Sequence, residues 1–128
     1  MIKVNFSAAI HAPKQRVWYI LWEKSFYEQW TSLFSEGSTV KTDGWKEGSM
    51  VQFLGPNENG MVSMVVANKP NEYMSFRHLG IVKDGVEDTT SDEAKGWAGA
   101  MENYTLKEEN GITALTVEME TTEEYKDY

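Results

Sequence analysis

The strongest constraint on the fold is the strict alternation of the first ten residues. Every second residue is apolar, and the residues between them are polar or small. The apolar members are Ile2, Val4, Phe6, Ala8 and Ile10. A period of two is typical of a strand with one buried face. The alternation stops at Pro13, which suits the first turn of a helix because proline has no N–H to leave unpaired.

Two short helices are predicted after this strand. From Pro13 to Trp22 the apolar residues follow helical spacing, with Val17 and Leu21 four positions apart. Such a stripe indicates a helix that packs one face on the core. The segment Ser25–Trp30 is predicted as a second short helical or turn-like element.

The rest of the chain predicts antiparallel strands joined by short connections. The expected strands are Thr39–Thr42, Ser49–Leu54, Met61–Ala67, Glu72–Leu79, Trp97–Glu108 and Thr113–Glu120. Asn110-Gly111 is a strong hairpin signal, and the polar, acidic segment Lys83–Gly96 is expected to be a mobile loop. One strand, two helices and then a run of strands predict an α+β fold with one antiparallel sheet, in a single domain over residues 1–128.

The end of the chain carries a helix-start signal. Thr121-Thr122-Glu123-Glu124 has the pattern of a capping box, and the sequence stops about two turns later at Tyr128. We therefore expect only the beginning of a C-terminal helix, which leaves an apolar sheet face uncovered. The residues expected on that face are Val51, Phe53, Phe76, Leu115, Val117 and Met119. An exposed apolar face predicts a homodimer, exchange of elements with a neighbour, or a fragment of a longer product.

Composition narrows the function. The chain has no cysteine and only two histidines, which excludes thiol nucleophiles, cysteine metal sites and a multi-histidine zinc site. No metal and no cofactor is expected. A net charge of −8 argues against binding to a nucleic-acid backbone. No apolar run reaches the length of a membrane span, and no secretion signal is visible, so a cytoplasmic protein is expected.

An ordered series of segments resembles a known superfamily. Its pieces are Ala12–Trp22, Tyr27 with Trp30-Thr31, Phe34-Ser35-Glu36-Gly37, Trp45-Lys46-Glu47-Gly48, Pro70-Asn71-Glu72-Tyr73 and Trp97 with Glu102 and Tyr104. Together they are similar to the SRPBCC superfamily, in the branch of homologues of the activator of the heat-shock-protein-90 ATPase. The resemblance implies a helix-grip fold, in which a curved antiparallel sheet wraps a long C-terminal helix around an apolar cavity. This chain departs from that pattern because only the start of the long helix is present.

Two polar residues fall on faces that should point inward. His78 shares a strand face with Met74 and Phe76, where it either contacts a ligand or is satisfied by an ordinary hydrogen bond. Glu102 shares a face with Tyr104, and a buried carboxylate is costly unless it is paired. Its partner could be Arg77, His78 or a cation of the ligand. The alternative is that Glu102 makes a structural hydrogen bond or lies at a sheet edge.

Aromatic residues are the other candidates for a cavity lining. Five tryptophans in 128 residues could surround a flat apolar ligand or could simply fill the core. Trp18 and Trp22 are expected to be mostly packing. The full set of expected ligand-binding residues is Trp30, Phe53, Phe76, His78, Trp97, Glu102 and Tyr104.

These features favour a small binding protein that is not an enzyme. Its ligand would be an apolar or amphipathic small molecule, held by burial of apolar area and oriented by one or two polar groups. A co-chaperone-like module that acts on an Hsp90-type ATPase is a second hypothesis. A cyclase or aromatase type of enzyme is a third, without an evident acid–base pair.

Overall fold

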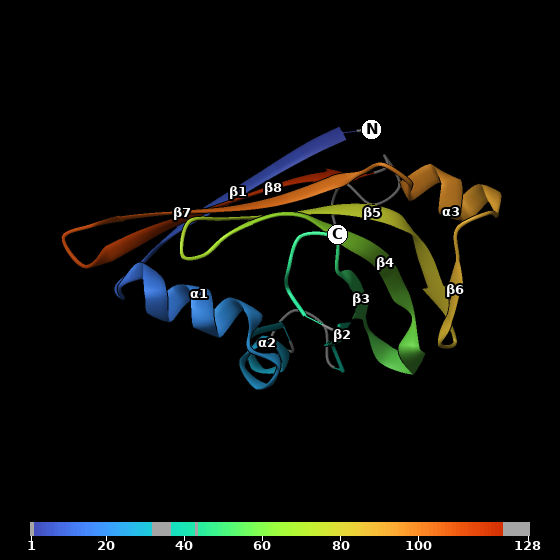
Figure 1. The fold of residues 1–128 in the computed structure, drawn as a ribbon, viewed down its shortest axis with the longest axis horizontal. Coiled ribbons are helices and arrows are strands. Elements are labelled where there is room, and N and C mark those ends of the chain that lie inside the picture. The colour runs from blue at the N-terminus through green and yellow to red at the C-terminus, as the bar shows by residue number, and fades with distance from the viewer. Residues whose placement is uncertain (1, 32–36, 43, 122–128) are drawn as a thin grey trace.

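The fold is one antiparallel sheet with its first two short helices on the concave side (Figure 1). The computed structural model describes residues 2–31, 37–42 and 44–121. The strands are β1 (Ile2–Ile10), β2 (Thr39–Thr42), β3 (Met50–Leu54), β4 (Gly60–Lys69), β5 (Tyr73–Lys83), β6 (Val86–Asp88), β7 (Met101–Glu109) and β8 (Ile112–Thr121). The helices are α1 (Lys14–Trp22), α2 (Lys24–Thr31), the 3₁₀ turn Pro56–Glu58 and α3 (Asp92–Trp97). The predicted α+β class with a curved sheet is confirmed.

Neighbouring strands run in the order β1-β8-β7-β5-β4-β3-β2, and β6 pairs with β5. The first strand therefore pairs with the last, as Val4 opposite Met119 illustrates. Asn110 and Gly111 both have positive φ, at 53° and 78°, so the predicted hairpin between β7 and β8 is confirmed.

Two irregularities bend the sheet where β4 meets β5. The pairing register shifts between Val62 and Ser63, and again between Val65 and Ala67. An extra residue on one strand of a pair increases its bend and twist. In Figure 1, β3 and β4 consequently curve down and away from the plane of β1, β7 and β8.

Helix α1 covers part of the concave face. Its Val17, Leu21 and Trp22 are buried against the sheet. The Trp22 ring lies 4.9 Å from the Tyr104 ring and 5.4 Å from the Phe76 ring, measured between centroids. Such edge-to-face contacts add to the gain from burying large apolar surfaces. This aromatic cluster anchors the helix.

The expectation of an uncovered sheet face is wrong for most of its residues. Val51, Phe76, Leu115 and Val117 are buried, and Phe53 and Met119 are partly buried. Helix α1 covers more of the face than its length suggests, because the sheet curves toward it and Trp22 packs on Phe76 and Tyr104. The predicted helix start leaves Thr121 as the last residue of β8, and 122–128 lie outside the described residues.

The prediction of a mobile loop over Lys83–Gly96 is also wrong. Asp84 and Gly85 have φ of 50° and 81° and form a tight turn that leads into β6. Helix α3 then begins behind Ser91, whose Oγ accepts a hydrogen bond of 3.1 Å from the Ala94 N–H. The predicted strand Trp97–Glu108 is shifted as a consequence, since Trp97 ends α3 and β7 begins at Met101.

Candidate functional site

A groove of about 860 Å³ lies on the concave face of the sheet. Its apolar lining comes from Val4, Phe53, Leu54, Pro56, Met61, Ile81, Val82, Trp97 and Met119. Its polar lining includes Tyr27 of α2, His78 of β5 and Glu102 of β7. Strands and helix α2 together bring residues from distant parts of the chain to one surface.

His78 is held at the centre of the sheet. Its Nδ1 lies 2.6 Å from the Oγ of Ser63 on the neighbouring strand β4, and the register places the two residues directly opposite each other. Its backbone N–H donates to the carbonyl oxygen of Ala100 at 2.8 Å. The ring also faces the Trp97 ring edge to face, with the centroids 6.5 Å apart. The orientation of the imidazole is therefore fixed.

Glu102 lies beside this histidine with its side chain only 16% exposed. Its Oε2 accepts a hydrogen bond of 2.8 Å from the hydroxyl of Tyr104, two residues along β7. Its Oε1 is 4.0 Å from the Nε2 of His78, which is too long for a hydrogen bond. The two side chains thus face each other across a gap.

Burial shifts the pKa of each of these groups toward its uncharged form. Desolvation lowers the pKa of His78 to about 4, so the imidazole is neutral at pH 7. Desolvation raises the pKa of Glu102, and the hydrogen bond from Tyr104 opposes this rise. Burial, followed by the nearby Glu102 charge, raises the pKa of both Tyr27 and Tyr104. The site therefore favours neutral side chains.

The predicted site residues fall into two groups in the structure. Phe53, His78, Trp97 and Glu102 line the groove. Phe76 is fully buried between rings of the core, and Tyr104 is buried against the rings of Trp22 and Phe76. Trp30 lies in α2, but its side chain is outside the described residues. A role in ligand binding stays a prediction for all of them.

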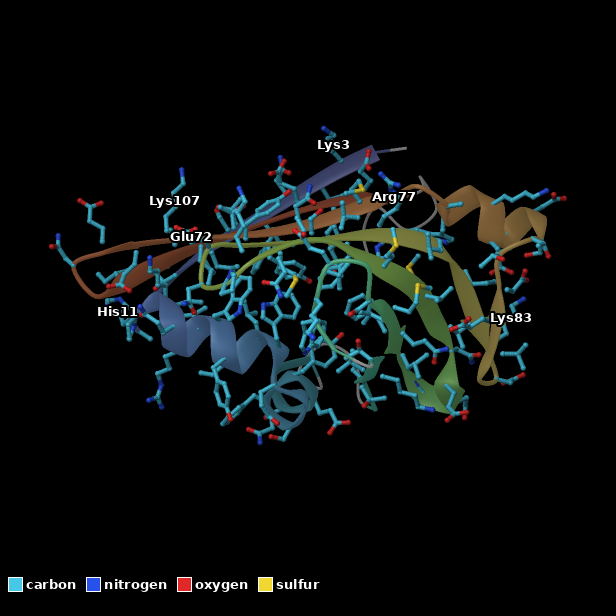
Figure 2. All side chains as sticks on the ribbon, viewed as in Figure 1. Lys3, His11, Glu72, Arg77, Lys83 and Lys107 are labelled. Carbon is cyan, nitrogen blue, oxygen red and sulfur yellow. The ribbon has the colours of Figure 1, made fainter. Side chains whose placement is uncertain are left out.

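The sheet geometry shows which of Arg77 and His78 lies on the same face as the Glu102 carboxylate. Successive residues of a strand point to opposite faces, so Arg77 and His78 cannot both lie in the groove. Figure 2 shows Arg77 on the side of the sheet away from α1, where it is exposed. His78 is the nearer of the two, but it makes no hydrogen bond to the carboxylate at 4.0 Å, and the hydrogen-bond partner of Glu102 is Tyr104.

Sequence reasoning missed Ser63 and Tyr27. Ser63 is fully buried, in the middle of the apolar strand β4. A lone serine among apolar residues was a usable signal, because a buried hydroxyl requires a hydrogen-bond partner. Tyr27 belongs to the resembling segment, but the position of its hydroxyl near Glu102 depends on how α2 packs on the sheet.

Other possible sites are weaker. A smaller hollow of about 300 Å³ is lined by Trp22, Val40, Lys41, Thr42 and Trp45, and only a lysine there is ionisable. Within the described ranges, no three His, Asp or Glu side chains come together as metal ligands would. None of the described helices has the length and apolarity needed to cross a bilayer.

Comparison with known proteins identifies solved structures with the same fold. No protein-family model matches the chain, and no curated protein matches it. The Aha1 dimer from Colwellia psychrerythraea has a TM-score of 0.68 at 17% identity, over 99% of this chain and 84% of that one. Protein MLL2253 from Mesorhizobium loti has a TM-score of 0.70 at 16% identity, over 98% and 80%. CalU16 from Micromonospora echinospora has a TM-score of 0.66 at 17% identity, over 96% and 61%.

These likenesses concern the fold. An Aha1 structure is among the neighbours, in agreement with the resemblance in the sequence, and the expected helix-grip type of α+β fold is confirmed. Identities of 14–17% among the neighbours leave the function to be argued from the groove itself.

Proposed function

We propose that this protein binds an apolar or amphipathic small molecule in the groove on its concave face. The observation that carries the proposal is a mostly apolar lining around one buried polar pair, His78 and Glu102. Ligand sites commonly combine apolar walls with a few fixed polar groups, and their volumes run from about 300 to 1,000 Å³. The groove falls in this range.

The affinity would come from two terms. Half-buried side chains such as Phe53 and Met119 lose their remaining contact with water when a ligand covers them. The polar pair then orients the ligand, because Ser63 holds His78 in place and Tyr104 holds Glu102 in place.

The other hypotheses from the sequence stay predictions. A co-chaperone-like role and a cyclase or aromatase activity are both compatible with this fold, and a fold alone does not select between them. The dimer named for one neighbour is a property of that protein. Self-association and a cytoplasmic location of this chain are further predictions.

The test is to look for a ligand and then to fill the groove. The purified protein is incubated with a lipid extract, and native mass spectrometry is used to detect a bound species. Met61 lines the groove, so Met61→Trp should reduce binding by occupying its volume. Val86→Trp is the matched control, because Val86 is 67% exposed on β6. The proposal is contradicted if no species binds the wild type, or if both variants bind equally.

A further inference from the structure

One atom of each member of the polar pair is left for a ligand. The Nδ1 of His78 is engaged with Ser63, and the Oε2 of Glu102 is engaged with Tyr104. No described residue makes a hydrogen bond to the remaining atoms, the Nε2 of His78 and the Oε1 of Glu102. Both side chains are nevertheless mostly buried, at 6% and 16% exposure. Neither atom is among the fully buried atoms that lack a partner, so both face the space of the groove, where water or a ligand can bond to them.

The distance between the two atoms selects the size of that partner. They lie 4.0 Å apart. A single oxygen atom can sit about 2.8 Å from both, because twice that hydrogen-bond length exceeds the separation. One small polar group therefore spans the gap.

The chemistry of the two atoms determines which type of ligand group fits between them. A neutral imidazole offers either a donor or an acceptor at Nε2, and Ser63 can match both cases because a hydroxyl donates and accepts. If Nε2 carries the proton, it donates a hydrogen bond to the ligand, and the ligand must in turn donate one to the carboxylate. If Glu102 is protonated, it donates to the ligand, and the ligand must donate to Nε2. A hydroxyl group meets both demands at once, whereas an ether oxygen has no proton to donate.

Charged ligand groups fit less well. A carboxylate would lie against Glu102, in a groove whose described walls also carry Asp84, Glu93 and Glu120. The lysine in that lining, Lys83, already pairs with Glu93 at 2.9 Å. An ammonium group would satisfy the pair only when Nε2 is the acceptor, and its charge would lose hydration against a mostly apolar lining.

We propose that the groove selects neutral apolar alcohols or phenols, with the hydroxyl oxygen seated between His78 Nε2 and Glu102 Oε1. This inference rests on the proposed function, since it names the class of ligand for the same groove. The hydrogen-bonded series then runs from Ser63 through His78, the ligand hydroxyl and Glu102 to Tyr104.

The probes are 2-naphthol and 2-methoxynaphthalene, whose apolar rings are identical and which differ in the hydroxyl proton. Equilibrium dialysis at pH 7 should show about tenfold tighter binding of the naphthol. Equal binding of the two probes overturns the hydroxyl site and leaves the groove as an apolar site. Binding of neither probe overturns the proposed function as well.

A pair of variants tests the assignment to Glu102. Glu102→Gln should reduce the preference to within about twofold, because an amide N–H can donate to an ether oxygen as well as to a hydroxyl. Glu118→Gln makes the same chemical change at an exposed position of β8 and should keep the full preference. An unchanged preference in Glu102→Gln contradicts the assignment.

A measurement on the wild type covers the case in which Glu102→Gln does not fold. The ¹⁵N signal of His78 Nε2 should shift when 2-naphthol is added and shift much less with 2-methoxynaphthalene. His11 serves as the internal reference, because it is the only other histidine. Equal shifts of His78 with both probes overturn the proposal.

Discussion

The concave face has two halves that are built from the same strands and differ in what covers them. In the helix-covered half, Trp22 of α1 packs against Phe76 and Tyr104, and apolar contacts fill the space. In the groove half, Phe53 and Met119 are only partly buried around His78 and Glu102. The helix-covered half stabilises the fold. The groove half contains polar side chains whose removal from water is unfavourable. We expect substitutions to separate these two roles.

The largest effect is expected in the helix-covered half. Trp22→Ala should lower the free energy of unfolding by about 3 to 5 kcal/mol, because it leaves a cavity among packed rings. Urea unfolding followed by circular dichroism measures this loss. Tyr19→Ala on the same helix is the control, since Tyr19 is 59% exposed, and it should cost less than about 1 kcal/mol. Similar losses for the two variants would contradict the anchoring role of Trp22.

The second effect is a pH dependence that arises in the groove half. The folded pKa of His78, about 4, lies below its value of 6.5 in the unfolded chain, so the unfolded state binds more protons between these pH values. Stability should therefore fall as the pH drops, by about 2 kcal/mol between pH 7 and pH 5. The raised pKa of Glu102 acts in the opposite direction, since it removes stability as the pH rises above the ordinary range of a glutamate.

Two variants isolate the histidine. His78→Gln should lose this fall in stability, while His11→Gln, outside the groove, should keep it. Urea midpoints at the two pH values provide the comparison. An identical pH profile for wild type and His78→Gln would show that burial does not control this histidine.

A smaller effect is expected at the wall of the groove. Phe53→Ala should lower the free energy of unfolding by about 1.5 kcal/mol, since the ring is only partly buried. It should also weaken the binding of 2-methoxynaphthalene about fivefold, as measured by equilibrium dialysis. Val86→Ala on the exposed β6 should change neither quantity. If Phe53→Ala destabilises as strongly as Trp22→Ala, the two halves do not differ in the way described.

The smallest effect is expected from Ser63→Ala. Loss of the hydrogen bond to His78 Nδ1 should cost about 1 kcal/mol and shift the ¹⁵N signal of that nitrogen. Ser75→Ala is the matched control, because Ser75 is also buried but bonds to Asn103. It should leave the His78 signals unchanged. A shift of equal size in both variants would contradict a specific role for Ser63.

Short sequence patterns predict those helices, strands and turns whose structure depends on neighbouring residues in the chain. Alternation identified β1, Pro13 marked the start of α1, and Asn110-Gly111 indicated the last hairpin. The sequence of the segment before Trp97 does not predict its structure, because its polar residues resemble those of a loop. Its structure depends on a tight turn at Asp84-Gly85 and on the Ser91 cap.

Sequence patterns predict an α+β chain with one antiparallel sheet, and they place His78 and Glu102 as polar residues on apolar faces. Which polar residues come close to one another depends on how the strands pair. The 4.0 Å gap between His78 and Glu102, the bond to Ser63 and the separation from Arg77 all depend on strand register and on the bulges between β4 and β5. Register is a long-range property of paired strands, and a one-residue slip would send each side chain to the opposite face.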